Sequence, residues 1–108
     1  MLDEDAYVAR AQPELRHLLD AIDRLESERV EAEFESDILT IEFDDGTRYV
    51  INSHRAARQI WMAAERSAWH FDWDEDKHAW ISLKSGDELW ATLARVIGTK
   101  LGTHVELR

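Results

Sequence analysis

The chain has 108 residues, 44% of them hydrophobic, and a formal net charge of −10 at pH 7. Its length predicts one domain, residues 1–108, that buries roughly 65% of its unfolded surface, and five tryptophans exclude a disordered acidic tail. The chain contains no cysteine, which excludes disulfides and thiolate metal sites, and it has no basic stripe that would bind the phosphates of a nucleic acid.

The start of the chain does not resemble a targeting segment. Residues 1–5 are largely acidic and lack the basic and apolar regions of a signal peptide. No apolar run approaches the ~18 residues that a membrane span requires. We therefore expect a soluble cytoplasmic protein without a membrane partner, or a mature form whose targeting segment is absent.

The first predicted element is an amphipathic helix from about residue 5 to residue 26. Its apolar residues recur every three or four positions, at Val8, Ala11, Leu15, Leu18, Ile22 and Leu25. Pro13 lies within this stretch, and proline has no N–H to donate to the carbonyl group four residues earlier. The sequence therefore predicts a kink at Pro13 or a helix that restarts there.

From Val30 onward, hydrophobic residues alternate with polar ones, which is typical of half-buried strands. The Asp45-Gly46 pair is a strong hairpin signal. Six strands are predicted, over residues 30–35, 38–43, 48–52, 59–64, 69–73 and 79–83.

A second helix is predicted near the end of the chain. Ser85 and Glu88 have the spacing of a capping box, with Ser85 as the N-cap. An apolar stripe follows, and Gly98 or Gly102 ends the helix before a short extended tail over residues 105–107. Short connections favour antiparallel pairing, so we predict an α+β two-layer sandwich, ordered α-β-β-β-β-β-β-α. Both helices cover one face of a roughly six-stranded sheet, and the other face is open to water.

Negative charge is concentrated in the first 45 residues, which contain 15 acids and 4 arginines, a net of −11, against 8 acids and 9 Lys+Arg in the remainder. Several of these acids are spaced to share one surface: Asp20, Asp23 and Glu26, then Glu31, Glu33 and Glu35. A solvated face is one interpretation. Like charges at this spacing are unfavourable, however, and glutamate is a poor strand former, so a functional role is the other. Carboxylates without cysteine favour hard cations such as Mg²⁺, Ca²⁺, Mn²⁺ or iron, bound weakly at an open surface.

The open face of the predicted sheet carries a second candidate surface. Strand alternation places Trp61 beside Gln59 and opposite to Ile60 and Met62, and it places Asn52 and His70 on the same side as Trp61. An exposed tryptophan is typical of a protein contact. Alternatively, the tail or a neighbouring loop covers it, and spacing alone does not decide between the two. No catalytic motif or enclosing cleft supports an enzyme.

Short motifs along nearly the whole chain resemble the frataxin family in its bacterial form. They are Leu39-Thr40-Ile41-Glu42-Phe43-Asp44-Asp45-Gly46, Tyr49-Val50-Ile51-Asn52, Gln59-Ile60-Trp61-Met62-Ala63, Trp69-His70-Phe71-Asp72-Trp73, Trp80 and Ser85-Gly86-Asp87-Glu88-Leu89-Trp90. The resemblance implies the sandwich fold and an acidic ridge that binds Fe²⁺ or Fe³⁺ weakly, with other divalent cations as alternatives. This acidic ridge carries over to Asp20, Asp23, Glu26, Glu31 and Glu33.

The resemblance also implies a partner surface on the sheet, which carries over to Asn52, Gln59, Trp61 and His70. Its partners would be the cysteine desulfurase and the scaffold protein of iron–sulfur cluster assembly. The chain would then regulate this assembly or supply iron to it, as a monomer, with metal-driven oligomers left open. The alternative is a metal-independent acidic protein that masks a basic partner surface. An iron-oxidising enzyme is a weaker third interpretation.

Overall fold

The computed structural model describes residues 2–108 as two helices and six strands. In chain order the elements are α1 (Glu4–Asp23), β1 (Val30–Glu35), β2 (Ile38–Phe43), β3 (Arg48–His54), the 3₁₀ turn η1 (Arg55–Ala57), β4 (Gln59–Ala64), β5 (Ser67–Asp74), β6 (Ala79–Ser82) and α2 (Leu89–Leu101). The predicted order of elements is confirmed.

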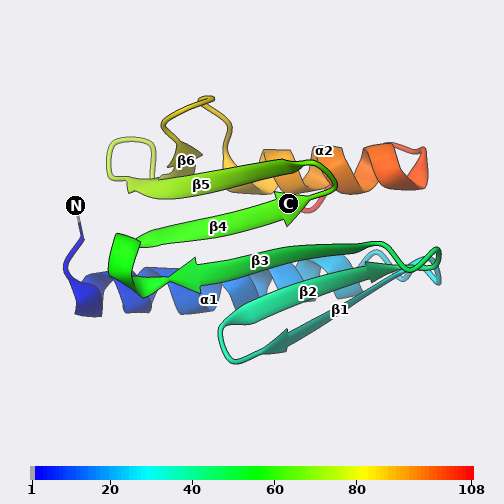
Figure 1. Ribbon diagram of the computed structural model, residues 1–108, viewed down its shortest axis with the longest axis horizontal. Helices are drawn as coiled ribbons and strands as arrows, with labels where there is room; N and C mark the ends of the chain where they lie inside the picture. The colour runs from blue at the N-terminus through cyan, green and yellow to red at the C-terminus, as the bar shows by residue number, and fades with distance from the viewer. Residues whose placement is uncertain (1) are drawn as a thin grey trace.

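The six strands form one antiparallel sheet in which each strand pairs with its neighbours in the sequence, in the order β1-β2-β3-β4-β5-β6. Both helices lie behind the same face of this sheet, with α1 crossing behind β3 and α2 running behind β5 (Figure 1). The other face carries no helix. The predicted two-layer sandwich is therefore confirmed, with one face of the sheet left open.

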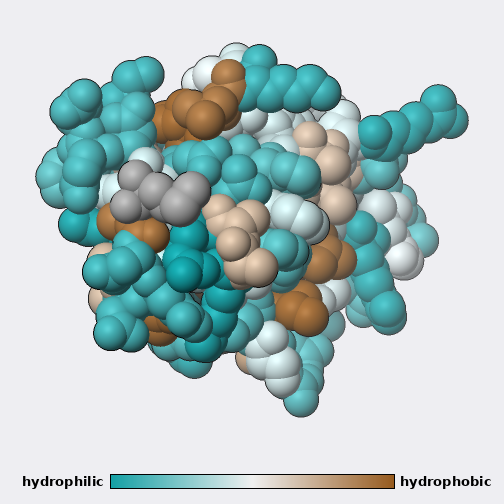
Figure 2. All heavy atoms as spheres, turned by 60° about the vertical axis from the view of Figure 1, so that its left-hand side comes forward, coloured by the Kyte–Doolittle hydropathy of each residue, from teal (hydrophilic) through white to brown (hydrophobic). Residues whose placement is uncertain are grey.

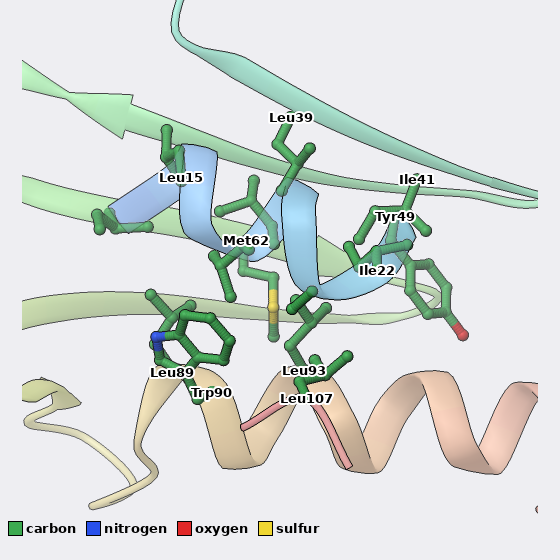
Figure 3. Packing of buried hydrophobic residues seen from close by; sticks show 14 of the residues in the cluster. Leu15, Ile22, Leu39, Ile41, Tyr49, Met62, Leu89, Trp90, Leu93 and Leu107 are labelled. Atoms are coloured by element: carbon green, nitrogen blue, oxygen red, sulfur yellow. The ribbon is translucent and has the colours of Figure 1, made fainter. Parts of the chain in front are cut away.

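The core fills the space between the helices and the covered face of the sheet. Leu15 of α1, Leu39 of β2 and Leu93 of α2 are each fully buried and converge in this layer (Figure 3). Burying one such leucine contributes about 1.5–3 kcal/mol. Near the end of the chain, Leu107 is also buried, so the tail closes one side of the core.

The first helix differs from its prediction at both ends. Asp3 is the N-cap, and its Oδ1 accepts a hydrogen bond from the Ala6 N–H at 2.8 Å. The helix ends at Asp23 rather than at Glu26, because Glu26 has a φ of 51°, outside the helical region. The helix is continuous through Pro13 and does not restart there.

The N-cap of α2 is Glu88, so the prediction of Ser85 was wrong. The Glu88 carboxylate accepts hydrogen bonds from the N–H groups of Trp90 and Ala91, at 2.8 and 3.0 Å. Ser85 belongs instead to the preceding turn, where its hydroxyl donates to Asp87 at 2.9 Å. At the other end, Gly102 has a φ of 73° and donates to the Gly98 carbonyl, so Gly102 ends the helix.

The outer surface is mostly hydrophilic at the end of the molecule that carries the N-terminus, with hydrophobic residues in small separate areas (Figure 2). Large exposed hydrophobic side chains are few among residues 2–108: Leu83 is 80% exposed and Ile38 43%. In the same residues, no helix combines the length and the apolar character that crossing a membrane requires.

Candidate functional site

The strand acids of the acidic ridge lie on β1, which is an edge strand of the sheet. Glu31 pairs with Glu42 of β2, and Glu33 pairs with Thr40. Their β2 partners alternate with the buried residues Ile41 and Phe43. Because side chains alternate between the two faces of a sheet, Glu31 and Glu33 point to the open face, where both are exposed.

The helix acids of the ridge lie on the other side of this edge. Asp20 and Asp23 are exposed in the last turn of α1, and Glu26 is exposed in the loop that follows. The five predicted ligands therefore flank the β1 edge from both layers of the sandwich. Within residues 2–108, no three His, Asp or Glu side chains are close enough to hold a metal ion together. The ridge is an open charged edge without a preformed coordination site.

The ridge acids lack the cations that neutralise other acids nearby. Asp44 pairs with Arg29 at 3.4 Å, and Glu42 pairs with Arg48 at 2.9 Å. Over residues 2–108, by contrast, none of the ion pairs includes one of the five ridge acids. The last turn of α1 also contains acids and no basic residue, although carboxylates at a helix C-terminus oppose the helix dipole. The fold therefore holds the ridge carboxylates in an electrostatically unfavourable arrangement.

Just beyond the ridge, the β2–β3 hairpin is tied to the end of α2. The Lys100 ammonium lies 2.7 Å from the Asp45 carboxylate and 3.6 Å from Glu65 of the β4–β5 turn. The hydrogen bond from Lys100, aided by the Thr47 N–H, holds the pKa of Asp45 well below its usual range. The same hydrogen bond raises the pKa of Lys100. This pair contributes to the fold, and it leaves the ridge acids uncompensated.

On the open face, the predicted partner residues come together in one row across three strands. Asn52 of β3 pairs with Trp61 of β4, and Trp61 pairs with His70 of β5. Gln59 lies two positions before Trp61 on the same face, and its amide donates to the Asp72 carboxylate at 3.1 Å. The strand alternation read from the sequence therefore placed these side chains on a common face.

Trp61 is half-buried, and the contacts that hold it come from β3, β4 and β5. Its ring stacks between two imidazoles, with centroids 3.8 Å from that of His54 and 4.2 Å from that of His70. The indole N–H donates to Gln59 Oε1 at 2.8 Å. The sequence analysis missed His54, because it ended the third strand at Asn52. Extending the alternation by two residues would have placed His54 on the same face.

Comparison with known proteins identifies related sequences over most of the chain. A family model described as a frataxin-like domain matches residues 1–103. The iron-sulfur cluster assembly protein CyaY of Ralstonia nicotianae is 32% identical over 110 aligned residues, which cover 98% of this chain and 95% of that protein. The protein of the same name from Thioalkalivibrio sulfidiphilus is 40% identical over 70 residues, 65% of each chain.

Solved structures share the fold. Frataxin from Psychromonas ingrahamii superimposes with a TM-score of 0.89, with 22% identity and 99% of each chain covered. A trimeric frataxin from the yeast Saccharomyces cerevisiae, complexed with ferrous iron, gives a TM-score of 0.74 and 27% identity, with 86% of each chain covered. The first match bears on the fold alone, because its sequence identity is low.

Proposed function

This chain belongs to the frataxin family, and from that premise we propose that it binds iron at the acidic ridge and takes part in iron–sulfur cluster assembly. Its partners would be the cysteine desulfurase and the scaffold protein on which clusters form. The related proteins named for iron–sulfur cluster assembly and the yeast relative complexed with ferrous iron support this proposal. It acts through binding, and the proposal includes no catalytic step.

One observation carries the metal part of the proposal: the ridge acids are exposed and have no cation partners in residues 2–108. Their oxygen atoms suit Fe²⁺ and other hard divalent cations. A cation at this edge would relieve the repulsion between neighbouring carboxylates. Because no compact ligand set exists among residues 2–108, several carboxylates and water molecules would share the ion, and binding would be weak.

The partner part of the proposal uses two surfaces. The ridge would attract a basic region of the desulfurase by charge. The row of Asn52, Trp61 and His70, with Gln59 beside it, would contact the scaffold protein. Trp61 and the two imidazoles stacked on it offer an aromatic surface there, and tryptophan is typical of residues that dominate binding energy.

A metal titration followed by amide NMR tests the proposal. Anaerobic addition of Fe²⁺ should shift and broaden signals over residues 20–35, with smaller effects elsewhere. The double variant Asp20→Asn/Asp23→Asn should weaken binding in part, because a shared ion does not depend on a single ligand. The control Glu4→Gln/Asp76→Asn makes the same change in net charge in the first turn of α1 and in the β5–β6 turn, away from the ridge, and should leave binding nearly unchanged.

Two results would contradict this picture in different ways. If one ridge substitution abolished binding completely, a discrete coordination site would replace the open ridge. If residues 20–35 did not respond below about 1 mM Fe²⁺, a range in which even weak biological cation sites respond, the metal proposal would fail. The second candidate, a metal-independent acidic interaction protein, would then be favoured, and the absence of a compact ligand cluster in residues 2–108 already fits it.

A further inference from the structure

The Trp61 indole is contacted on both ring faces and at its N–H. The His54 ring lies parallel to one face, at 3.8 Å and 15°, and the His70 ring lies parallel to the other, at 4.2 Å and 11°. Its N–H donates to Gln59, whose own amide donates to both carboxylate oxygens of Asp72, at 3.3 and 3.1 Å. These contacts fix one orientation of a side chain that stands on an open sheet face.

His54 differs from His70 because it also closes the next turn. Its Nδ1 accepts a hydrogen bond from the Ala57 N–H at 3.3 Å and caps η1. A ring nitrogen accepts a hydrogen bond only when it carries no proton. The contact therefore requires the neutral imidazole with its proton on Nε2. An imidazolium would direct a second N–H at the Ala57 N–H, and this hydrogen bond would be lost.

We propose that His54 is a positioning residue for Trp61 that works only as the neutral imidazole, so that acidification releases the indole from its fixed orientation. The cap holds the imidazole ring in place, and the ring in turn holds the indole. Histidine is the side chain whose ordinary titration range lies closest to physiological pH. The orientation of the Trp61 indole on the open sheet face would thus depend on pH.

The charged and titratable groups around His54 come from several elements. On its own turn, Arg55 follows it directly, and Arg58 donates to the Arg55 carbonyl. From the β1–β2 turn, Asp37 pairs with Arg55 at 3.5 Å. From α1, the Tyr7 hydroxyl donates to the Gln59 carbonyl at 2.7 Å. From β5, His70 stacks on the other face of Trp61, and Asp72 accepts hydrogen bonds from Gln59.

The inference concerns the isolated chain, and only its consequence for partner binding rests on the proposed function. If Trp61 contacts the scaffold protein, a fixed indole spares the entropy of ordering it on binding. Release of the indole at low pH would then weaken the complex without altering the fold.

The test is an NMR pH titration of the full chain from pH 8 to pH 5.5. It observes the Trp61 indole N–H, assigned by loss of its signal in Trp61→Phe, together with the Ala57 amide and the His54 ring. The titration is repeated in His70→Gln, so that only one stacked histidine remains. We expect the Trp61 and Ala57 signals to shift with the same midpoint as the His54 ring, in both proteins, and the Ala57 amide to exchange at least tenfold faster with solvent at the acid end.

Two variants separate the stacked ring from the cap. His54→Phe keeps an aromatic ring against Trp61 but cannot titrate, so its Trp61 signal should stay sharp in the His70→Gln background at both ends of the titration. His54→Asn keeps a capping oxygen for Ala57 but removes the ring, so its Trp61 signal should be broad already at pH 8. His78→Gln, which alters the histidine beside Trp73, is the matched control and should behave as the parent.

The inference is overturned if the parent Trp61 signal does not follow the His54 ring, an outcome that requires no variant to fold. It is also overturned if His54→Asn gives the same sharp, titrating signal as the parent. Either result leaves the proposed function standing, because Trp61 could still contact the scaffold protein. Conversely, a normal titration combined with unchanged scaffold binding by Trp61→Ala would contradict the partner surface and leave the role of His54 intact.

Discussion

Trp61 and Trp80 show how the face of the sheet on which a side chain lies decides its role. Trp80 lies on the covered face and is 1% exposed, in edge-to-face contact with Tyr7. Trp61 lies on the open face, where two histidines and a glutamine hold it without burying it fully. The same residue type therefore serves the core in one position and is available to a partner in the other.

At the residue scale, we predict that Trp61→Ala leaves the fold intact and weakens scaffold binding by about 2 kcal/mol or more, with little dependence on salt. Trp80→Ala should instead cost about 3–5 kcal/mol of folding free energy. Thermal unfolding and calorimetric binding measure the two effects. Unfolding of Trp61→Ala would make Trp61 a core residue, and a folded variant with unchanged binding would exclude it from the contact.

Single residues were also where the sequence predicted least. His54 is the last residue of β3, two positions beyond the predicted end of that strand. Alternation could have placed it on the open face, but its stacking on Trp61 and its cap of η1 depend on contacts that the sequence does not show. Ser85 was predicted to cap the second helix, but its hydroxyl bonds to Asp87 and the cap is Glu88. Both serine and glutamate can accept from a helix N-terminus, so only the path of the preceding turn selects between them.

At the scale of elements, alternation and helical periodicity were sufficient to predict all six strands and both helices. The differences lie at ends without a hydrophobic signal. β5 begins at Ser67, two residues before the predicted start at Trp69, because Ser67 and Ala68 pair with Ala64 and Ala63. These small residues carry no clear alternation, and backbone pairing alone extends the strand.

The edge strand β1 places glutamates close to another acid on the neighbouring strand. Glu31 lies directly opposite Glu42, and like charges in this position are destabilising. We expect Glu31→Gln/Glu33→Gln to raise the free energy of unfolding by about 0.5–1 kcal/mol. Chemical denaturation of the variant and the parent measures this difference in unfolding free energy. Glu42→Gln is the control and should give no such gain, because it removes the ion pair with Arg48.

The opposite result would have a clear meaning for the ridge. If the double variant unfolded at a lower denaturant concentration than the parent, the ridge would not be a repulsive cluster. The argument that function maintains an unfavourable set of charges would then lose its basis. Addition of salt should stabilise the parent in the same direction, since it screens exposed charges.

At the scale of the whole molecule, Lys100 connects α2 to two hairpins, through Asp45 and Glu65. The folded state lowers the pKa of Asp45. Its contribution to stability is therefore present above the unfolded pKa, about 3.9, and is lost as the pH falls through the folded value. The folded state raises the pKa of Lys100, so its contribution is present below about 10.4 and is lost as the pH rises through the folded value.

We therefore predict that Asp45→Asn lowers the melting temperature throughout pH 5–9 and makes the decline of melting temperature below about pH 4 less steep. Melting curves recorded by circular dichroism across this range measure both effects. Asp44→Asn is the matched control, because Asp44 pairs more loosely with Arg29, at 3.4 Å, and its effect should be smaller. Equal melting temperatures for Asp45→Asn and the parent at pH 7 would show that the Lys100 contact does not stabilise the fold.

Net charge is divided unevenly along the chain, with −11 in residues 1–45 and +1 in residues 46–108. The fold places the ridge at the β1 edge of the sheet and Trp61 on β4, three strands further in. The two proposed contacts therefore differ in physical character and can be separated by ionic strength. The charge contact acts over a screening length of about 10 Å at 0.1 M salt, whereas the aromatic contact requires direct packing.

We predict that desulfurase affinity falls steeply between low and physiological salt, mainly through a slower association rate. Glu31→Gln/Glu33→Gln should reduce this salt dependence, whereas Trp61→Ala should leave its slope unchanged while weakening binding to the scaffold. Stopped-flow association at several salt concentrations provides the measurement. A salt-independent association rate in the parent would exclude charge attraction by the ridge. A change of slope in Trp61→Ala would show that the two surfaces act as one, because the row of Asn52, Trp61 and His70 would then be contributing to the same electrostatic contact.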